Sequence, residues 1–154
     1  MSKIGRYSAD RKKIEDLTAD KTIQVADCGT VFMLKTATGL TASLPNAADA
    51  GKGWWCKFIV ATDITNGTYA YAISGTLSDD INIEAVQTFT SAAASVTTGS
   101  SAPITYPDAT AGTAVGMIEF KAASSVGDQI ELMTDGTNWY ALGHSYDAAA
   151  MNFS

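Results

Sequence analysis

The feature that most constrains the fold is a succession of short apolar segments separated by turn-forming residues. Ile81–Val86 alternates apolar and polar side chains, and Val31–Leu34 and Val115–Lys121 are other short segments of this kind. A period of two is typical of a half-buried β-strand, and clusters of glycine, proline and asparagine commonly bound such strands. About nine such segments follow one another at spacings typical of a sandwich or barrel, with no long amphipathic helix. The sequence therefore predicts an all-β fold, a jelly-roll-like β-sandwich.

Two dipeptides predict tight hairpins between these strands. Asn66-Gly67 stands between the apolar run 54–62 and the segment Tyr69–Ile73. Asp135-Gly136 stands between Gln129–Met133 and Asn138–Leu142. Both dipeptides favour the positive φ angles that a two-residue hairpin loop requires. The segment Ser91–Pro107 is rich in Ala, Ser, Thr and Gly, and it predicts a long loop or weak edge strands.

Charge divides the chain into unequal parts. The 154 residues carry 10 basic and 16 acidic side chains, a formal net charge of −6. Residues 1–21 hold six of the basic and four of the acidic ones. We therefore expect a basic N-terminal arm (1–21), a β-sandwich body (22–146) and a small-residue C-terminal tail (147–154). Within the arm, Ser8 or Asp10 could cap a short helix.

The same charge balance constrains the partners. An acidic protein repels a phosphate backbone, so we expect no nucleic-acid partner. The run Arg11-Lys12-Lys13 is interleaved with acidic residues, and docking on an acidic protein surface suits it better. No apolar run approaches the length of a membrane span or a signal peptide, so we expect no membrane association and no secretion signal.

Few residues in the chain point to catalysis or to a bound group. His144 is the only histidine, and its neighbour Ser145 would face the opposite side of an extended strand. Acidic residues at positions 79, 80 and 84 match no calcium-loop spacing and indicate a solvated turn. Cys28 and Cys56 lack CxxC spacing, which favours two free, buried thiols over zinc or a disulfide. We expect no enzyme activity, no cofactor and no metal.

The tryptophan pair Trp54-Trp55 is a candidate for a contact between subunits. Adjacent side chains on an extended strand point to opposite faces of the sheet. One of the two indoles should therefore lie outside the core, and an outward tryptophan favours a subunit contact.

Several segments in a fixed order resemble small β-structured virion proteins of tailed bacteriophages. The segments are Gly29–Leu34 (GTVFML), Ser43–Pro45 (SLP), Gly53–Val60 (GWWCKFIV), Gly127–Leu132 (GDQIEL) and Thr134–Tyr140 (TDGTNWY). The opening Ile4–Lys13 (IGRYSADRKK) is similar to that of structural proteins of cyanophage-like myoviruses. The resemblance covers most of the chain.

The resemblance implies a place in the virion. A tail-fibre shaft needs heptads or an internal repeat, and this chain has neither, whereas a capsid decoration (cement) protein needs only a compact body and a gripping arm. Such a protein would bind the major capsid protein on the outer capsid surface, as a homotrimer, after synthesis in the host cytoplasm. The arm residues that would grip the shell are Lys3, Arg6, Tyr7, Arg11, Lys12 and Lys13.

A second function stays open at this point. The chain could be a receptor- or glycan-binding domain of a phage fibre or baseplate. Exposed aromatic side chains such as Trp54 or Trp55, together with the loop Ser91–Pro107, would then hold the ligand.

Overall fold

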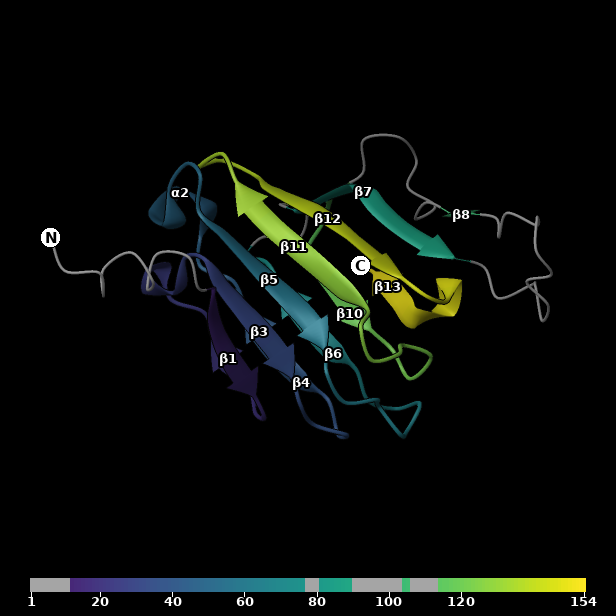
Figure 1. Cartoon of the computed structure of the whole chain (residues 1–154). Coiled ribbons are helices and arrows are strands. Elements are labelled where there is room, and N and C mark those ends of the chain that lie inside the picture. The colour runs from purple at the N-terminus through teal and green to yellow at the C-terminus, as the bar shows by residue number, and fades with distance from the viewer. Residues whose placement is uncertain (1–11, 77–80, 90–103, 106–113) are drawn as a thin grey trace, which may run out of the picture.

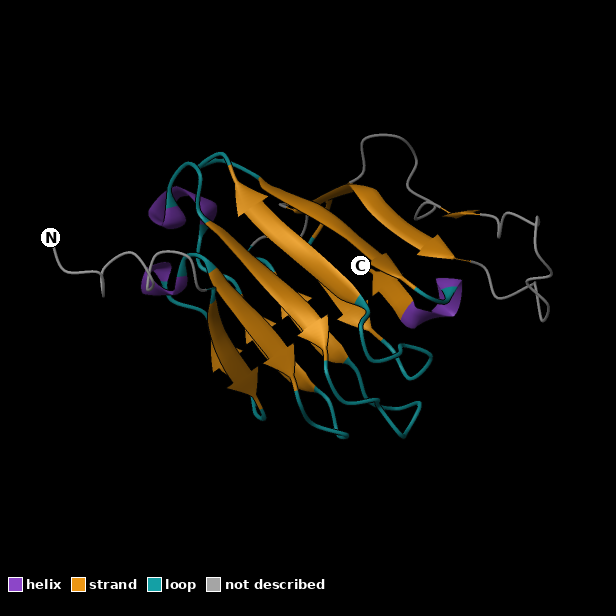
Figure 2. Cartoon of the chain, viewed as in Figure 1, coloured by secondary structure: helices purple, strands orange, loops and turns teal. Residues whose placement is uncertain are grey.

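A computed structural model gives the structure of the chain, and it describes residues 12–76, 81–89, 104–105 and 114–154. The described residues form two β-sheets packed face to face, with helical segments of no more than four residues (Figures 1 and 2). These segments are η1 (Val25–Asp27), α2 (Ala47–Ala50) and η2 (Ala148–Ala150). The predicted all-β sandwich without a long helix is confirmed.

The larger sheet has the strand order β1-β3-β5-β11-β12-β7-β8, with β9 paired to β7. Its strands are β1 (Lys13–Leu17), β3 (Thr30–Leu34), β5 (Trp55–Val60), β7 (Ile81–Phe89), β8 (Ile104–Thr105), β9 (Ala114–Val115), β11 (Gln129–Thr134) and β12 (Trp139–Ser145). The smaller sheet has the order β13-β10-β6-β4-β2. Its strands are β2 (Lys21–Thr22), β4 (Leu40–Ser43), β6 (Tyr71–Ser74), β10 (Met117–Phe120) and β13 (Met151–Phe153).

From β1 to β6 the chain alternates between the two sheets (Figure 1). Each strand of one sheet is followed by a strand of the other, so β1, β3 and β5 pair in parallel, as do β2, β4 and β6. Parallel neighbours need a crossover connection, and here the strand in the opposite sheet serves as that connection.

This alternation overturns the hairpin predicted at Asn66-Gly67. The strands on its two sides, β5 and β6, lie in different sheets and do not pair. Gly67 has no positive φ, and the Asn66 carbonyl accepts a hydrogen bond from the Tyr69 amide in an ordinary turn. At Asp135-Gly136 the predicted hairpin is present, because β11 and β12 pair antiparallel, but it turns through residues 135–138, and within the dipeptide only Gly136 has a positive φ, +91°.

The N-terminal segment is a strand where we expected a short helix. Lys13–Leu17 pairs in parallel with β3 along its whole length, which satisfies its backbone and buries Leu17. A helix here would have buried only Ile14 and Leu17, too little to stabilise so short an element. The expected tail supplies β13, which pairs with β10 at the edge of the smaller sheet. The strand β8 lies at an edge, as predicted for a weak strand within Ser91–Pro107.

The core lies between the sheets and is rich in aromatic rings. Phe32 and Phe58 stack with ring centroids 5.2 Å apart, and Trp54 meets Trp139 edge to face at 5.3 Å. All four side chains are at most 3% exposed. This packing fixes the strands of the larger sheet and therefore determines which side chains its other face presents to solvent.

Candidate functional site

The outer face of the larger sheet carries an unusual number of apolar side chains. Along β5, β11 and β12, alternate residues are buried in the core, and the residues between them point outward. Four of the outward side chains are large, apolar and strongly exposed: Ile14 (65%), Leu142 (55%), Met133 (44%) and Tyr140 (42%). Half-buried Met33, Trp55 and Ile59 extend the surface. We call these seven residues the outer apolar face.

The smaller sheet presents a different surface. Its outward side chains are mostly small or polar: Thr41, Ser43, Ala72, Ser74, Met117, Glu119 and Asn152. Asn152 donates a hydrogen bond to the Glu119 carboxylate at 2.7 Å, and Lys121 pairs with the same group at 2.8 Å. Contiguous apolar patches on a soluble protein commonly mark an interaction site, so the larger sheet holds the candidate site.

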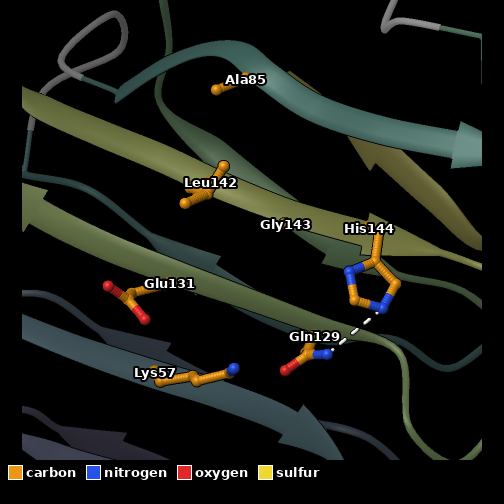
Figure 3. Close-up of a pocket in the computed structure, with 7 residues that line it drawn as sticks. All are labelled: Lys57, Ala85, Gln129, Glu131, Leu142, Gly143 and His144. Atoms are coloured by element: carbon orange, nitrogen blue, oxygen red, sulfur yellow. Dashed lines mark hydrogen bonds between the residues drawn. The ribbon is translucent and has the colours of Figure 1, made fainter.

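A pocket of about 550 Å³ lies on this face (Figure 3). Residues from four neighbouring strands line it: Lys57, Ala85, Gln129, Glu131, Leu142, Gly143 and His144. The Gln129 amide nitrogen lies 3.2 Å from His144 Nε2. Gly143 lets β11 and β12 approach closely, since a Cβ atom there would lie 2.4 Å from the Gln129 carbonyl oxygen.

Lys57 and Glu131 stand at the centre of the face. They are directly opposite each other in the antiparallel pair of β5 and β11. Among the described residues, neither side chain makes an ion pair or a hydrogen bond. One cation and one anion are therefore available here to a binding partner.

The structure holds two predicted arm residues against the body. The Lys13 ammonium lies 3.1 Å from Asp27 Oδ1, and the Lys12 ammonium lies 5.6 Å from the Trp55 ring centroid. Both residues lie at the edge where β1 begins. The other predicted arm residues lie outside the described residues: Lys3, Arg6, Tyr7 and Arg11.

Asp27 organises a small charged cluster beside β1. Lys21 lies 3.6 Å from Asp27 and also pairs with Glu15. Partial burial would raise the pKa of Asp27, but the Gln24 amide and the two lysines outweigh it and hold that pKa below its usual value. Partial burial would lower the pKa of Lys21, but the hydrogen bond to Glu15 and the charge of Asp27 outweigh it and raise that pKa. The cluster fixes β1 to the body.

Trp54 and Trp55 face opposite sides of the sheet, as predicted. Trp54 is 3% exposed, and its Nε1–H donates to the Val25 carbonyl at 2.8 Å. Trp55 belongs to the outer apolar face, and its ring packs beside Gly29. Trp55 is thus the outward tryptophan, and its role in a subunit contact stays a prediction.

The remaining candidates are placed as follows. His144 is exposed and Ser145 is buried, so the two side chains lie on opposite faces as expected. Both cysteines are free, but Cys28 is exposed, so only Cys56 is the buried thiol that we predicted. Asp79 and Asp80 lie outside the described residues. Among the residues that the structure describes, no three His, Cys, Asp or Glu side chains are grouped to hold a metal ion.

Sequence reasoning missed most of the outer apolar face. Met133, Tyr140 and Leu142 were placed correctly on strands, but their exposure was not recognised. The signal was present in Trp139–Leu142, where four consecutive apolar residues put apolar side chains on both sides of one strand. Such a run predicts either burial on both faces or an apolar surface.

No helix in the described part of the chain is long and apolar enough to cross a membrane. We compared the chain with protein-family models, with curated proteins and with solved structures, and none of these comparisons found a match.

Proposed function

We propose that this protein is a capsid decoration (cement) protein of a tailed bacteriophage, which binds the outer shell and bridges neighbouring major capsid proteins. The observation that carries the proposal is the outer apolar face, because a large exposed apolar surface on one sheet suits a protein whose task is to bind other proteins. The resemblance of the chain to phage virion proteins supplies the setting.

Two surfaces of the protein would make different contacts. The basic N-terminal arm would contact the shell, and the outer apolar face around Trp55 would contact a neighbouring copy. Many weak contacts that act together would stabilise the capsid, since each bound copy adds a link between shell subunits. Because the protein would bind the assembled shell, its binding would shift the equilibrium toward the assembled state by mass action.

A second candidate function has one observation in its favour. The pocket on the outer face is lined by an amide, an imidazole, an ammonium and a carboxylate. Such groups hydrogen-bond to sugar hydroxyls, and a pocket with a few convergent polar groups is a common ligand site. A glycan-binding domain of a fibre or baseplate would use the pocket in this way.

Imaging of reconstituted heads tests the proposal. The purified full chain is mixed with undecorated heads of the phage that encodes it, and the heads are imaged by electron cryomicroscopy. We expect regularly spaced density on the outer shell. Heads without added density would contradict the decoration function, and binding of the chain to host-cell polysaccharide would then favour the second candidate.

A truncated chain tests the role of the arm. Removing residues 1–11 leaves β1 and the ion pair of Lys13 with Asp27 in place, so the body should keep its fold, which circular dichroism checks. The proposal predicts that the truncated chain no longer decorates heads. Decoration at an unchanged level would remove the arm from the mechanism.

A further inference from the structure

We infer that the outer apolar face binds the same face of a second copy of this chain, across a two-fold axis parallel to the strands and midway between β5 and β11. The inference goes beyond the proposed function, and it stands whether or not the chain belongs to a virion. It begins from the exposure of this face and rests on the order of side chains across it.

One row of side chains crosses six strands in register. Ile14 pairs with Val31, Val31 with Lys57, Lys57 with Glu131, Glu131 with Leu142, and Leu142 with Ala85. The row therefore reads apolar, apolar, cation, anion, apolar, apolar. The line between β5 and β11 divides the row into two halves. Each half has two apolar side chains, and the charged side chain next to the line is a cation in one half and an anion in the other.

A two-fold axis on that line makes the row complementary to itself. Rotation by 180° about an axis along the strands exchanges β5 and β11 between the two facing sheets, as in any isologous interface. Lys57 of each copy then faces Glu131 of the other, and Leu142, which is 55% exposed, lies over Val31, which is only 5% exposed in one copy and adds little new apolar contact. The usual rotation of about 30° between facing sheets would tilt the axis by about 15° from the strands, and it displaces the ends of the row far more than its centre, where the two charges lie.

The neighbouring row supports the same axis. Trp55 pairs with Met133, and Met133 pairs with Tyr140. The rotation places Trp55 of one copy against Met133 of the other, because these residues also lie on β5 and β11. A thioether against an aromatic ring is a favourable contact.

Net charge also favours this face for self-association. The chain carries a formal charge of −6, so two copies repel each other at long range. The central row contains one positive and one negative side chain, which cancel. Contact through this row adds no like-charge repulsion, and it supplies the partners that Lys57 and Glu131 lack among the described residues of one copy.

The dimensions of the face predict a weak dimer. Six strands spaced by roughly 4.8 Å and about five residues in length give a footprint of roughly 400 Å². A standard interface buries about 800 Å² on each partner, so this footprint falls in the size class of weak, reversible complexes, and the dimer should form only at high protein concentration.

Sedimentation velocity of the full chain at increasing concentration tests the inference. We expect a shift from the chain mass of 16.1 kDa to twice that mass. Lys57→Glu and Glu131→Lys each place like charges opposite each other twice in the dimer, so each should weaken dimerisation at least tenfold. The double variant exchanges the two charges and should restore it.

A matched control separates this effect from net charge. Lys52 is exposed in the loop before β5, and Lys52→Glu changes the net charge as Lys57→Glu does. The control variant should dimerise like the unaltered chain. A monomer at all concentrations, a trimer, or a double variant as weak as the single ones would overturn the inference. Because these measurements use the chain alone, their failure is distinguishable from a failure to decorate heads.

Discussion

Tyr71 connects the two sheets through its hydroxyl group, and removing that group should cost measurable stability. The ring lies on β6 of the smaller sheet and is fully buried. The hydroxyl lies 2.6 Å from the Thr62 carbonyl oxygen, contacts the Thr36 carbonyl, and accepts a hydrogen bond from the Thr36 amide at 3.3 Å. Thr36 and Thr62 follow β3 and β5 of the larger sheet. Burial raises the pKa of Tyr71, so the hydroxyl stays protonated at neutral pH and can donate.

Tyr71→Phe keeps the ring and removes only this network. Leaving buried backbone groups without their partner costs about 1–3 kcal/mol, and we expect about 2 kcal/mol here. For a chain of this size, that loss lowers Tm by about 4–8 °C. Thermal and urea denaturation followed by circular dichroism measure both quantities.

Tyr69→Phe is the matched control. Tyr69 is 41% exposed, and the structure gives its hydroxyl no hydrogen-bond partner among the described residues, so this variant should change stability by less than about 0.5 kcal/mol. Equal stability of the two variants would refute the claim that the Tyr71 hydroxyl links the sheets.

Three further predictions concern the cluster at β1, the close contact of β11 with β12, and the thiols. Asp27→Asn should cost about 1–2 kcal/mol at pH 7, because the folded state holds the pKa of Asp27 below its unfolded value. That stability is present above the unfolded pKa and is lost as the pH falls through the folded one, so urea titrations of the variant and the unaltered chain should converge as the pH falls below the usual pKa of an aspartate. Gly143→Ala places a Cβ atom against backbone and should cost about 2–4 kcal/mol in chemical denaturation, whereas Gly67→Ala, with open space around it, should be nearly neutral. In the native protein, Ellman's reagent should modify Cys28 rapidly and reach Cys56 only on unfolding, since burial raises the pKa of the Cys56 thiol; equal reaction of both thiols would contradict this placement.

The local pattern predicted strands well and their partners poorly. Ile81–Val86 and Gln129–Met133 were predicted correctly because the alternation of apolar and polar side chains depends only on which face of each strand is buried. The Asp135-Gly136 hairpin was found because its loop imposes the pairing of β11 with β12. The pairing at Asn66-Gly67 was wrong because a turn dipeptide does not reveal whether the next strand returns to the same sheet or crosses to the other one.

The candidate site depended on information that no single segment contains. It was predictable that one of the indoles of Trp54 and Trp55 points outward, because adjacent side chains on a strand point to opposite faces of the sheet. The row that joins Ile14 to Ala85 exists only once six strands are in register, and three of its five strand pairs are parallel pairs that were not predicted. Leu142 and Lys57 are far apart in sequence, so their shared surface follows from topology.

Oxidative labelling of side chains at increasing protein concentration tests most directly whether the outer apolar face is a contact surface. We expect Met133 and Tyr140, which are 44% and 42% exposed in one copy, to become protected as the concentration rises. Tyr69 lies in the loop between β5 and β6, is 41% exposed and should be labelled equally at every concentration. Labelling of Met133 and Tyr140 that does not change with concentration, or equal protection of Tyr69, would contradict a contact through the outer apolar face.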